Sequence, residues 1–149
     1  MGRRQLPEDF KDFFLSLNAH KVRYLLVGGW AVGLYGVPRA TKDIDILVAT
    51  DAENLFQLSQ ALLEFGAPAI DMAHFLEAGN VFRMGRSPVQ IDIINEASGV
   101  DMNECYARRN VIQWDGVSIS VISKEDLIVN KRASGRNQDL ADIDNLEDR

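Results

Sequence analysis

The chain has 149 residues, 46% of them hydrophobic, and can therefore bury about two-thirds of its unfolded surface in a single core. Acidic residues outnumber basic residues by 22 to 16, and the net charge of −6 argues against broad, sequence-independent binding of nucleic acid. The single cysteine, Cys105, excludes an intramolecular disulfide framework and is interpreted as a small buried hydrophobe in a reducing cytosol.

Neither a membrane anchor nor a targeting segment is indicated. No apolar run approaches the length that spans a bilayer. Charged residues between positions 8 and 12 interrupt the place where the apolar part of a signal peptide would lie. With no repeats, no low-complexity linker and only 4 prolines, the sequence predicts a single cytoplasmic domain over residues 1–149.

The first half of the chain alternates helix and strand signals. Pro7, followed by apolar residues at helical spacing, predicts the first helix, and a short apolar strand then stops at a glycine pair. Thr50, with Glu53 three residues later, forms a capping box that begins another helix. The predicted elements in this half are helices at residues 7–20, 30–35, 50–65 and 70–78, and strands at residues 23–27 and 42–49.

Two hairpins follow, and they indicate antiparallel pairing. Turn residues separate two pairs of short apolar runs, which is the pattern of strands joined by tight connections. The predicted strands are residues 80–84 and 89–95 in the first hairpin, and residues 111–114 and 117–122 in the second.

Two helices close the chain. Ser123 and Asp126 cap the first of them, which reaches Gly135. The final helix begins near residue 137 and carries an apolar face formed by Leu140, Ile143 and Leu146. Together with the elements before them, they predict an α+β fold in which a mixed, mostly antiparallel sheet has its helices packed on one side.

Two aspartates, Asp43 and Asp45, stand on one face of a predicted strand. Their neighbours Ile44 and Ile46 point the other way, because side-chain direction alternates along a strand. Two like charges side by side repel unless a cation lies between them, and Mg²⁺ prefers carboxylate, phosphate and water oxygens. A metal site is one interpretation, and a solvated strand face is the other.

A third aspartate, Asp92, lies in the middle of a later apolar strand. If this strand neighbours the strand of Asp43 and Asp45, three carboxylates share one patch. Two-metal phosphoryl transfer requires such a patch, with two ions about 4 Å apart. Asp92, near the nucleophile-side ion, would then be the natural base, whereas a charge on an edge strand is the alternative.

Further candidates surround this patch. Gly28 and Gly29 end one strand and open a helix, so their backbone N–H groups can point at an anion, although many glycine pairs only make a turn. Arg39 and Thr41 lie in the connection to the aspartate strand, where Arg39 can meet phosphate oxygens or stay on the surface. Lys131 lies beside the apolar face of its helix, where it either reaches the β or γ phosphate or snorkels past the core.

This pattern resembles the polymerase-β-like nucleotidyltransferase superfamily. The superfamily signature is a glycine pair, roughly a dozen residues, Asp-x-Asp on a strand, and a third carboxylate on a later strand. The chain is most similar to small bacterial and archaeal proteins related to abortive-infection nucleotidyltransferase toxins and to lincosamide nucleotidyltransferases. The matching residues are Val27 to Val32, Gly36, Arg39, Thr41, Asp43, Asp45 and Asp92, followed by Lys131, Gly135, Arg136, Asp139 and Asp142 near the end.

The resemblance implies a function. A nucleoside monophosphate would pass from an NTP, with ATP mildly favoured, to a hydroxyl acceptor, and pyrophosphate would be released. Two Mg²⁺ ions would bind at Asp43, Asp45 and Asp92, while Gly28, Gly29, Arg39, Thr41 and Lys131 would contact the nucleotide. The acceptor stays open between an antibiotic or other small molecule, a tRNA 3′ end and a protein side chain. The alternative is a non-catalytic NTP-binding or toxin–antitoxin module of the same fold.

The sequence departs from the superfamily at two points. Where many members continue the glycine turn with serine, this chain has Trp30 after Gly29, so phosphate contact there would rest on backbone N–H groups. The chain has no room for the second helical domain that shapes the acceptor pocket of larger members. Acceptor recognition would then depend on a second copy of the chain or on a partner protein.

Overall fold

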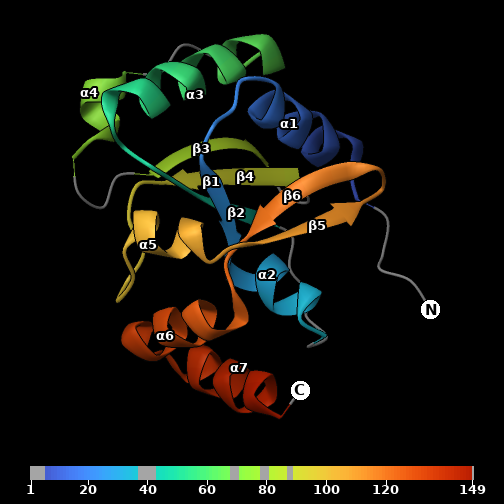
Figure 1. Ribbon diagram of the computed structural model, residues 1–149, viewed down its shortest axis with the longest axis vertical. Helices are drawn as coiled ribbons and strands as arrows, with labels where there is room; N and C mark the ends of the chain where they lie inside the picture. The colour runs from blue at the N-terminus through green and yellow to red at the C-terminus, as the bar shows by residue number, and fades with distance from the viewer. Residues whose placement is uncertain (1–5, 37–42, 68–70, 78–80, 87–88, 149) are drawn as a thin grey trace.

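The computed structural model describes residues 6–36, 43–67, 71–77, 81–86 and 89–148. Within these ranges six strands form one sheet in the order β3-β4-β2-β1-β6-β5 (Figure 1). Three of the five neighbouring pairs are antiparallel (β1 with β2, β3 with β4, β5 with β6), and two are parallel (β1 with β6, β2 with β4). The predicted mixed, mostly antiparallel sheet is confirmed. The strands are β1 Tyr24–Val27, β2 Asp43–Val48, β3 Val81–Arg86, β4 Val89–Ile94, β5 Asn110–Trp114 and β6 Val117–Val121.

The helices of the described residues fall into two groups. α1 and α3 pack against each other over one face of the sheet (Figure 1). α2 follows β1 directly, and α6 and α7 form a hairpin that lies beside α2, away from α1 and α3 (Figure 1). The helices are α1 Glu8–Ala19, α2 Gly28–Leu34, α3 Ala52–Phe65, α4 Met72–Phe75, α5 Met102–Ala107, α6 Lys124–Ser134 and α7 Asn137–Glu147.

One hydrophobic core holds these elements together. The central strand β1 is buried along its whole length, which is the pattern of a strand covered on both faces. The isoleucines of β2 and β4 join the aromatic side chains of α1 in the same core. Cys105 is also buried there, as predicted. The core isoleucines are Ile44, Ile46, Ile91 and Ile93.

Several local predictions need correction. The cap of α3 is Asp51, whose carboxylate accepts a hydrogen bond from the backbone N–H of Asn54, and not Thr50. α4 is shorter than predicted. α5 was not predicted, although Asp101 caps it by accepting from the N–H of Glu104, and Asp-x-x-Glu is a helix-start signal. Leu140 is 49% exposed, so the buried face of α7 lacks it.

No described helix combines the length and the hydropathy that crossing a bilayer requires.

Candidate functional site

The three aspartates predicted as a site lie on two adjacent strands. β2 and β4 pair in parallel, with Asp45 opposite Asp92 and Asp43 opposite Gln90. Laterally paired residues point to the same face of a sheet, and so do residues two apart. The isoleucine pair Ile44 and Ile91 therefore points to the opposite face, into the core. The condition for a shared carboxylate patch, that the two strands are neighbours, is met.

The carboxyl group of Asp45 lies in an unfavourable environment for its charge. Burial raises the pKa of Asp45 to about 6, and the negative charges of Asp92 and Asp43 act in the same direction. Lys131, near the end of α6, and Arg136, at the turn into α7, oppose this pKa rise by their positive charges. A carboxylate that is costly to ionise beside two others is a group that a bound cation would stabilise.

The glycine pair lies directly against the patch. Val27, the last residue of β1, pairs with Asp45 on β2, so the chain passes from the strand into α2 beside this carboxylate. Gly28 has a φ of +68°, and a Cβ atom at this position would overlap the Asp45 carboxyl group. Both constraints require glycine at position 28. Gly29 follows within the first turn of α2, as the predicted strand–glycine–helix arrangement requires.

Two side chains donate hydrogen bonds to the patch. Arg83, on β3, donates to Asp92 through Nε at 2.9 Å and Nη2 at 3.4 Å. The Gln90 amide nitrogen lies 3.2 and 3.4 Å from the two Asp92 oxygens and 3.4 Å from Asp43 Oδ2. One amide nitrogen therefore touches both carboxyl groups. As the side chains stand, no group of three or more His, Cys, Asp or Glu within the described ranges closes around a metal ion.

The patch nevertheless fits a hard divalent cation in its chemistry. Its ligand atoms are carboxylate oxygens, which Mg²⁺ prefers. The register sets Asp45 opposite Asp92, with Asp43 two residues away on the same face, so one counter-charge could serve all three groups. Asp43, Asp45 and Asp92 are therefore the residues that would hold such an ion, and their role as ligands stays a prediction. Arg39 and Thr41, the other predicted nucleotide contacts near this patch, lie outside the described residues.

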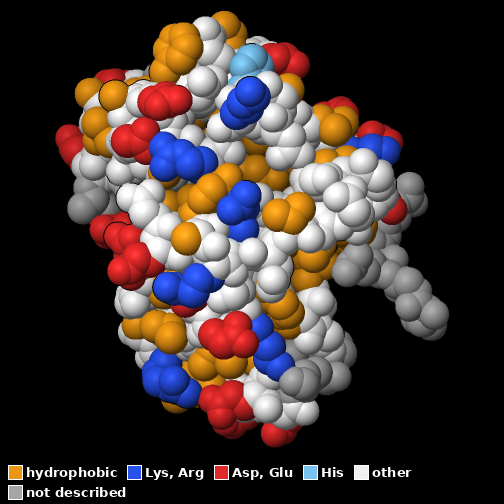
Figure 2. All heavy atoms as spheres, in the orientation of Figure 1, with side chains coloured by type: hydrophobic (Ala, Val, Ile, Leu, Met, Phe, Trp, Pro, Cys, Tyr) orange, Lys and Arg blue, Asp and Glu red, His pale blue; other side chains and the backbone are white. Residues whose placement is uncertain are grey.

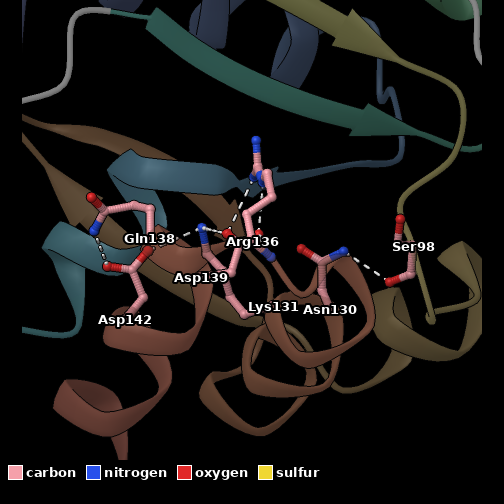
Figure 3. Close-up of polar contacts among 7 residues, drawn as sticks. All are labelled: Ser98, Asn130, Lys131, Arg136, Gln138, Asp139 and Asp142. Carbon is pink, nitrogen blue, oxygen red and sulfur yellow. Dashed lines mark hydrogen bonds and ion pairs between the residues drawn. The ribbon is translucent and has the colours of Figure 1, made fainter.

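Lys131 does not extend to solvent as a snorkelling side chain would. It is 4% exposed, and its Nζ lies 3.2 Å from Asp139 Oδ1 and 3.3 Å from Asp142 Oδ2 (Figure 3). Both aspartates belong to α7, so the lysine joins the two helices of the hairpin. The contact of Lys131 with a nucleotide stays a prediction. From this position its positive charge already lowers the pKa of Asp45.

Arg136 completes the same ion-pair network at the turn between α6 and α7. Its Nε and Nη2 donate to the two oxygens of Asp139 at 2.7 and 3.2 Å, a two-point contact (Figure 3). Burial would raise the pKa of Asp139, but the hydrogen bonds from Arg136 and Lys131 outweigh burial and hold this pKa below its usual range. The Arg136 side chain is 74% exposed, whereas that of Asp139 is fully buried.

Sequence reasoning assigned no role to Arg83 or Gln90, although a signal for Gln90 was present. In the hairpin of β3 and β4, Arg86 pairs with Val89, and counting outward from that pair places Arg83 opposite Asp92. Gln90 precedes Asp92 by two residues, so it points to the same face of β4. The predicted hairpin contained Arg83, but its predicted turn at residues 85–88 implies another register, so the pairing of Arg83 with Asp92 was found only in the structure.

Comparison with known proteins gives the family. The model of a family described as nucleotidyltransferases of unknown function, DUF6036, matches residues 4–147, which is nearly the whole chain. No curated protein sequence is significantly similar to the chain.

Solved structures of similar fold are distant in sequence. The lincosamide antibiotic adenylyltransferase LnuA, solved with lincomycin bound, is 22% identical with a TM-score of 0.63, over 97% of this chain and 98% of that chain. A Thermotoga maritima protein assigned as a nucleotidyltransferase is 18% identical with a TM-score of 0.64, over 95% and 92% of the two chains. The antibiotic-resistance factor ANT(2'')-Ia is 16% identical with a TM-score of 0.58, over 93% and 80%. These likenesses show a shared fold.

Proposed function

Because the chain belongs to the DUF6036 family of nucleotidyltransferases, we propose that it transfers a nucleoside monophosphate from an NTP to a hydroxyl acceptor and releases pyrophosphate. The observation that carries this proposal is the register of β2 and β4, which sets Asp45 beside Asp92 on the face that bears Asp43. ATP is the favoured donor, since one structural relative is an adenylyltransferase.

The three aspartates have different proposed roles. Asp43 and Asp45 would hold the Mg²⁺ ion that accompanies the triphosphate, and Asp92 would hold a second Mg²⁺ on the nucleophile side. When bound, such ions would supply a lower pKa for the attacking hydroxyl and a counter-charge for the leaving pyrophosphate. Asp92 accepts the hydroxyl proton while the acceptor oxygen bonds to the α-phosphorus and the bond from that phosphorus to pyrophosphate breaks.

The groups beside the patch orient the triphosphate. Gly28 lies against the Asp45 carboxyl group, and the backbone N–H groups of Gly28 and Gly29 are proposed to contact phosphate oxygens that would share the same cation. Arg39 and Thr41 are proposed to contact the phosphates from the connection that follows α2. Lys131 is proposed to attract the β or γ phosphate, held in place by its two aspartate partners on α7.

The acceptor defines the biological role. An antibiotic is one candidate, since LnuA was solved with lincomycin bound, and a tRNA 3′ end or a protein side chain are others. On the face seen in Figure 2, basic side chains are interspersed with acidic ones, which favours a small molecule or a protein over a long nucleic acid. We place the activity in a single cytoplasmic domain, with a second copy or a partner completing the acceptor pocket.

Labelled NTPs test this function directly. The protein is incubated with each α-labelled NTP, Mg²⁺ and fractionated cell extract, with Asp92→Asn as the matched control. The expected result is a labelled product from one NTP, formed by the parent protein and absent or greatly reduced with the variant. A parent protein that binds Mg-NTP but labels nothing in any fraction would instead be the non-catalytic toxin–antitoxin or sensing module.

A further inference from the structure

The carboxylate oxygens of Asp92 already accept hydrogen bonds from two side chains of the protein itself. Arg83 is its cross-strand partner, and the two donated hydrogen bonds reach both carboxylate oxygens, Nε to Oδ1 and Nη2 to Oδ2. The Gln90 amide lies within hydrogen-bond distance of the same two oxygens. A divalent ion at Asp92 would need oxygen lone pairs that these donors now use.

The two partners differ in how firmly the fold holds them. The Asp92 side chain is 11% exposed, whereas the Arg83 side chain is 62% exposed. Arg83 also belongs to β3, which is at the edge of the sheet, so its guanidinium can turn toward solvent without disturbing a packed neighbour. Asp92 lies on β4 between two strands and cannot make the equivalent movement. The ion pair between Arg83 and Asp92 can therefore break by movement of the arginine side chain, whereas the aspartate side chain stays in place.

The charge of Arg83 acts on the whole patch and not on Asp92 alone. Arg83 lies opposite Asp92, and Asp45, which pairs with Asp92 on its other side, stands on the same face of the sheet as Asp43. A cation that is stabilised by all three carboxylates is a counter-ion of the site. A divalent ion entering the patch would meet this positive charge as well as the occupied oxygens.

We propose that Arg83 is a positioning residue that holds Asp92 in its place on the patch and competes with a divalent cation for it. This inference rests on the proposed function, since it takes the three aspartates as the cation site. Arg83 thereby weakens metal binding when no nucleotide is present, and it keeps the Asp92 carboxylate oriented until the second ion arrives with the substrates. Gln90 supports the same orientation through its contacts with Asp92 and Asp43.

The test measures affinity for Mn²⁺ alone, without nucleotide, by electron paramagnetic resonance of the free ion. Arg83→Gln removes the charge but keeps an amide donor, and it is expected to tighten Mn²⁺ binding roughly two- to fivefold, the range of an exposed ion pair. Arg83→Lys keeps the charge and is expected to restore an affinity near that of the parent. Arg86→Gln is the matched control, because Arg86 is an exposed arginine on the same strand but pairs with Val89. It should leave the affinity unchanged.

A double-mutant cycle separates competition at Asp92 from a general change of charge. In an Asp92→Asn background, Arg83→Gln should no longer tighten Mn²⁺ binding. Equal tightening with and without Asp92, or by Arg86→Gln as well, would mean that only net charge matters and would overturn the proposal. So would unchanged or weaker binding by a folded Arg83→Gln protein, with folding checked by circular dichroism.

The same titration also distinguishes failure of this inference from failure of the proposed function. If the parent binds no Mn²⁺, with or without NTP, the metal site itself is wrong and the inference falls with it. If the parent binds Mn²⁺ and Arg83→Gln binds it equally well, the cation site stands and Arg83 is an edge-strand ion pair with a structural role only.

Discussion

Two groups of aspartates in this protein, one fully buried in the α6–α7 hairpin and one partly buried on the sheet, differ in their electrostatics. In the α6–α7 hairpin, Asp139 is enclosed by Lys131 and Arg136, and its pKa is held below the usual range. On the sheet, Asp45 is surrounded by other carboxylates, and its pKa rises to about 6. Burial raises the pKa in both places and is the largest cause at Asp45, whereas at Asp139 the hydrogen bonds from Arg136 and Lys131 reverse its effect.

The difference separates a structural role from a functional one. In the hairpin network, Lys131 and Arg136 neutralise the charges of Asp139 and Asp142, and these ion pairs hold α7 against α6. The strand patch keeps a repulsion that costs stability, and folds retain such a cost where a ligand relieves it. Variants of the two regions should therefore differ in which property they lose.

The largest expected effect is on turnover, from Asp92→Asn. The variant should lose at least about 10²- to 10⁴-fold in the rate of nucleotide transfer, the usual contribution of a positioned base, while Mg-NTP binding stays nearly intact. By contrast, Asn at Asp43 or Asp45 should abolish both binding and transfer. Steady-state rates and NTP binding isotherms of the three variants provide the measurement. Transfer at the parental rate by Asp92→Asn would show that Asp92 takes no part in the chemistry.

Next in size is the destabilisation expected from Lys131→Ala. Removing one partner of a buried ion pair leaves the carboxylates of Asp139 and Asp142 short of a cation, at a cost of about 3–5 kcal/mol. Urea unfolding monitored by circular dichroism measures this loss. The control is Arg132→Ala, because Arg132 is the adjacent residue and its pair with Glu147 is exposed, so its loss should cost less than about 1 kcal/mol.

The same Lys131→Ala protein tests the nucleotide role. Where it remains folded, its affinity for the triphosphate should fall roughly ten- to a hundredfold, the worth of a charge-assisted contact, while Mg²⁺-dependent transfer is still detectable at saturating NTP. Unchanged NTP affinity together with the stability loss would make Lys131 a purely structural residue.

A smaller effect is expected from the ligand itself. NTP together with Mg²⁺ should stabilise the parent by about 2.7 kcal/mol at 100 times the Kd, which raises Tm by roughly 5–10 °C. Either component alone should do much less, because phosphates and the carboxylates of the patch repel each other without the ion. Differential scanning fluorimetry checks this, and an equal shift in the presence of EDTA would contradict the metal model.

The smallest effect concerns pH and the metal-free protein. The pKa of Asp45 is about 6 in the folded state, against its ordinary value of 3.8. The destabilisation caused by ionising Asp45 therefore reaches its full size above about pH 6. This penalty should disappear as pH falls from about 6 toward 4. In EDTA, Asp45→Asn should therefore be more stable than the parent by about 1–2 kcal/mol at pH 8 and should lose that advantage near pH 4. A pH-independent difference would refute the assigned electrostatic cause.

Some elements could be predicted because their signals are local. Ser123 accepts a hydrogen bond from the N–H of Asp126 at the start of α6, and Gly135 ends that helix in the left-handed conformation, as short-range rules require. The cap of α3 was misassigned because Thr50 and Asp51 satisfy similar local rules. The choice between them depends on Asn54, whose side chain bonds to the backbone of Arg23 and Ala49 in neighbouring parts of the fold.

By itself, the sequence determined that Asp43 and Asp45 share one face of a strand, because alternation along a strand is a property of the backbone. It also placed a glycine pair at the end of the preceding strand, although the requirement for glycine at position 28 came from its positive φ and its approach to Asp45 in the structure. Only the tertiary structure decided that β4 pairs with β2 in the register that brings Asp92 to Asp45, and that Lys131 turns inward to α7. Both features depend on contacts between segments that are distant in the sequence. Packing and charge neutralisation in the folded protein favour these contacts, and no local sequence pattern encodes them.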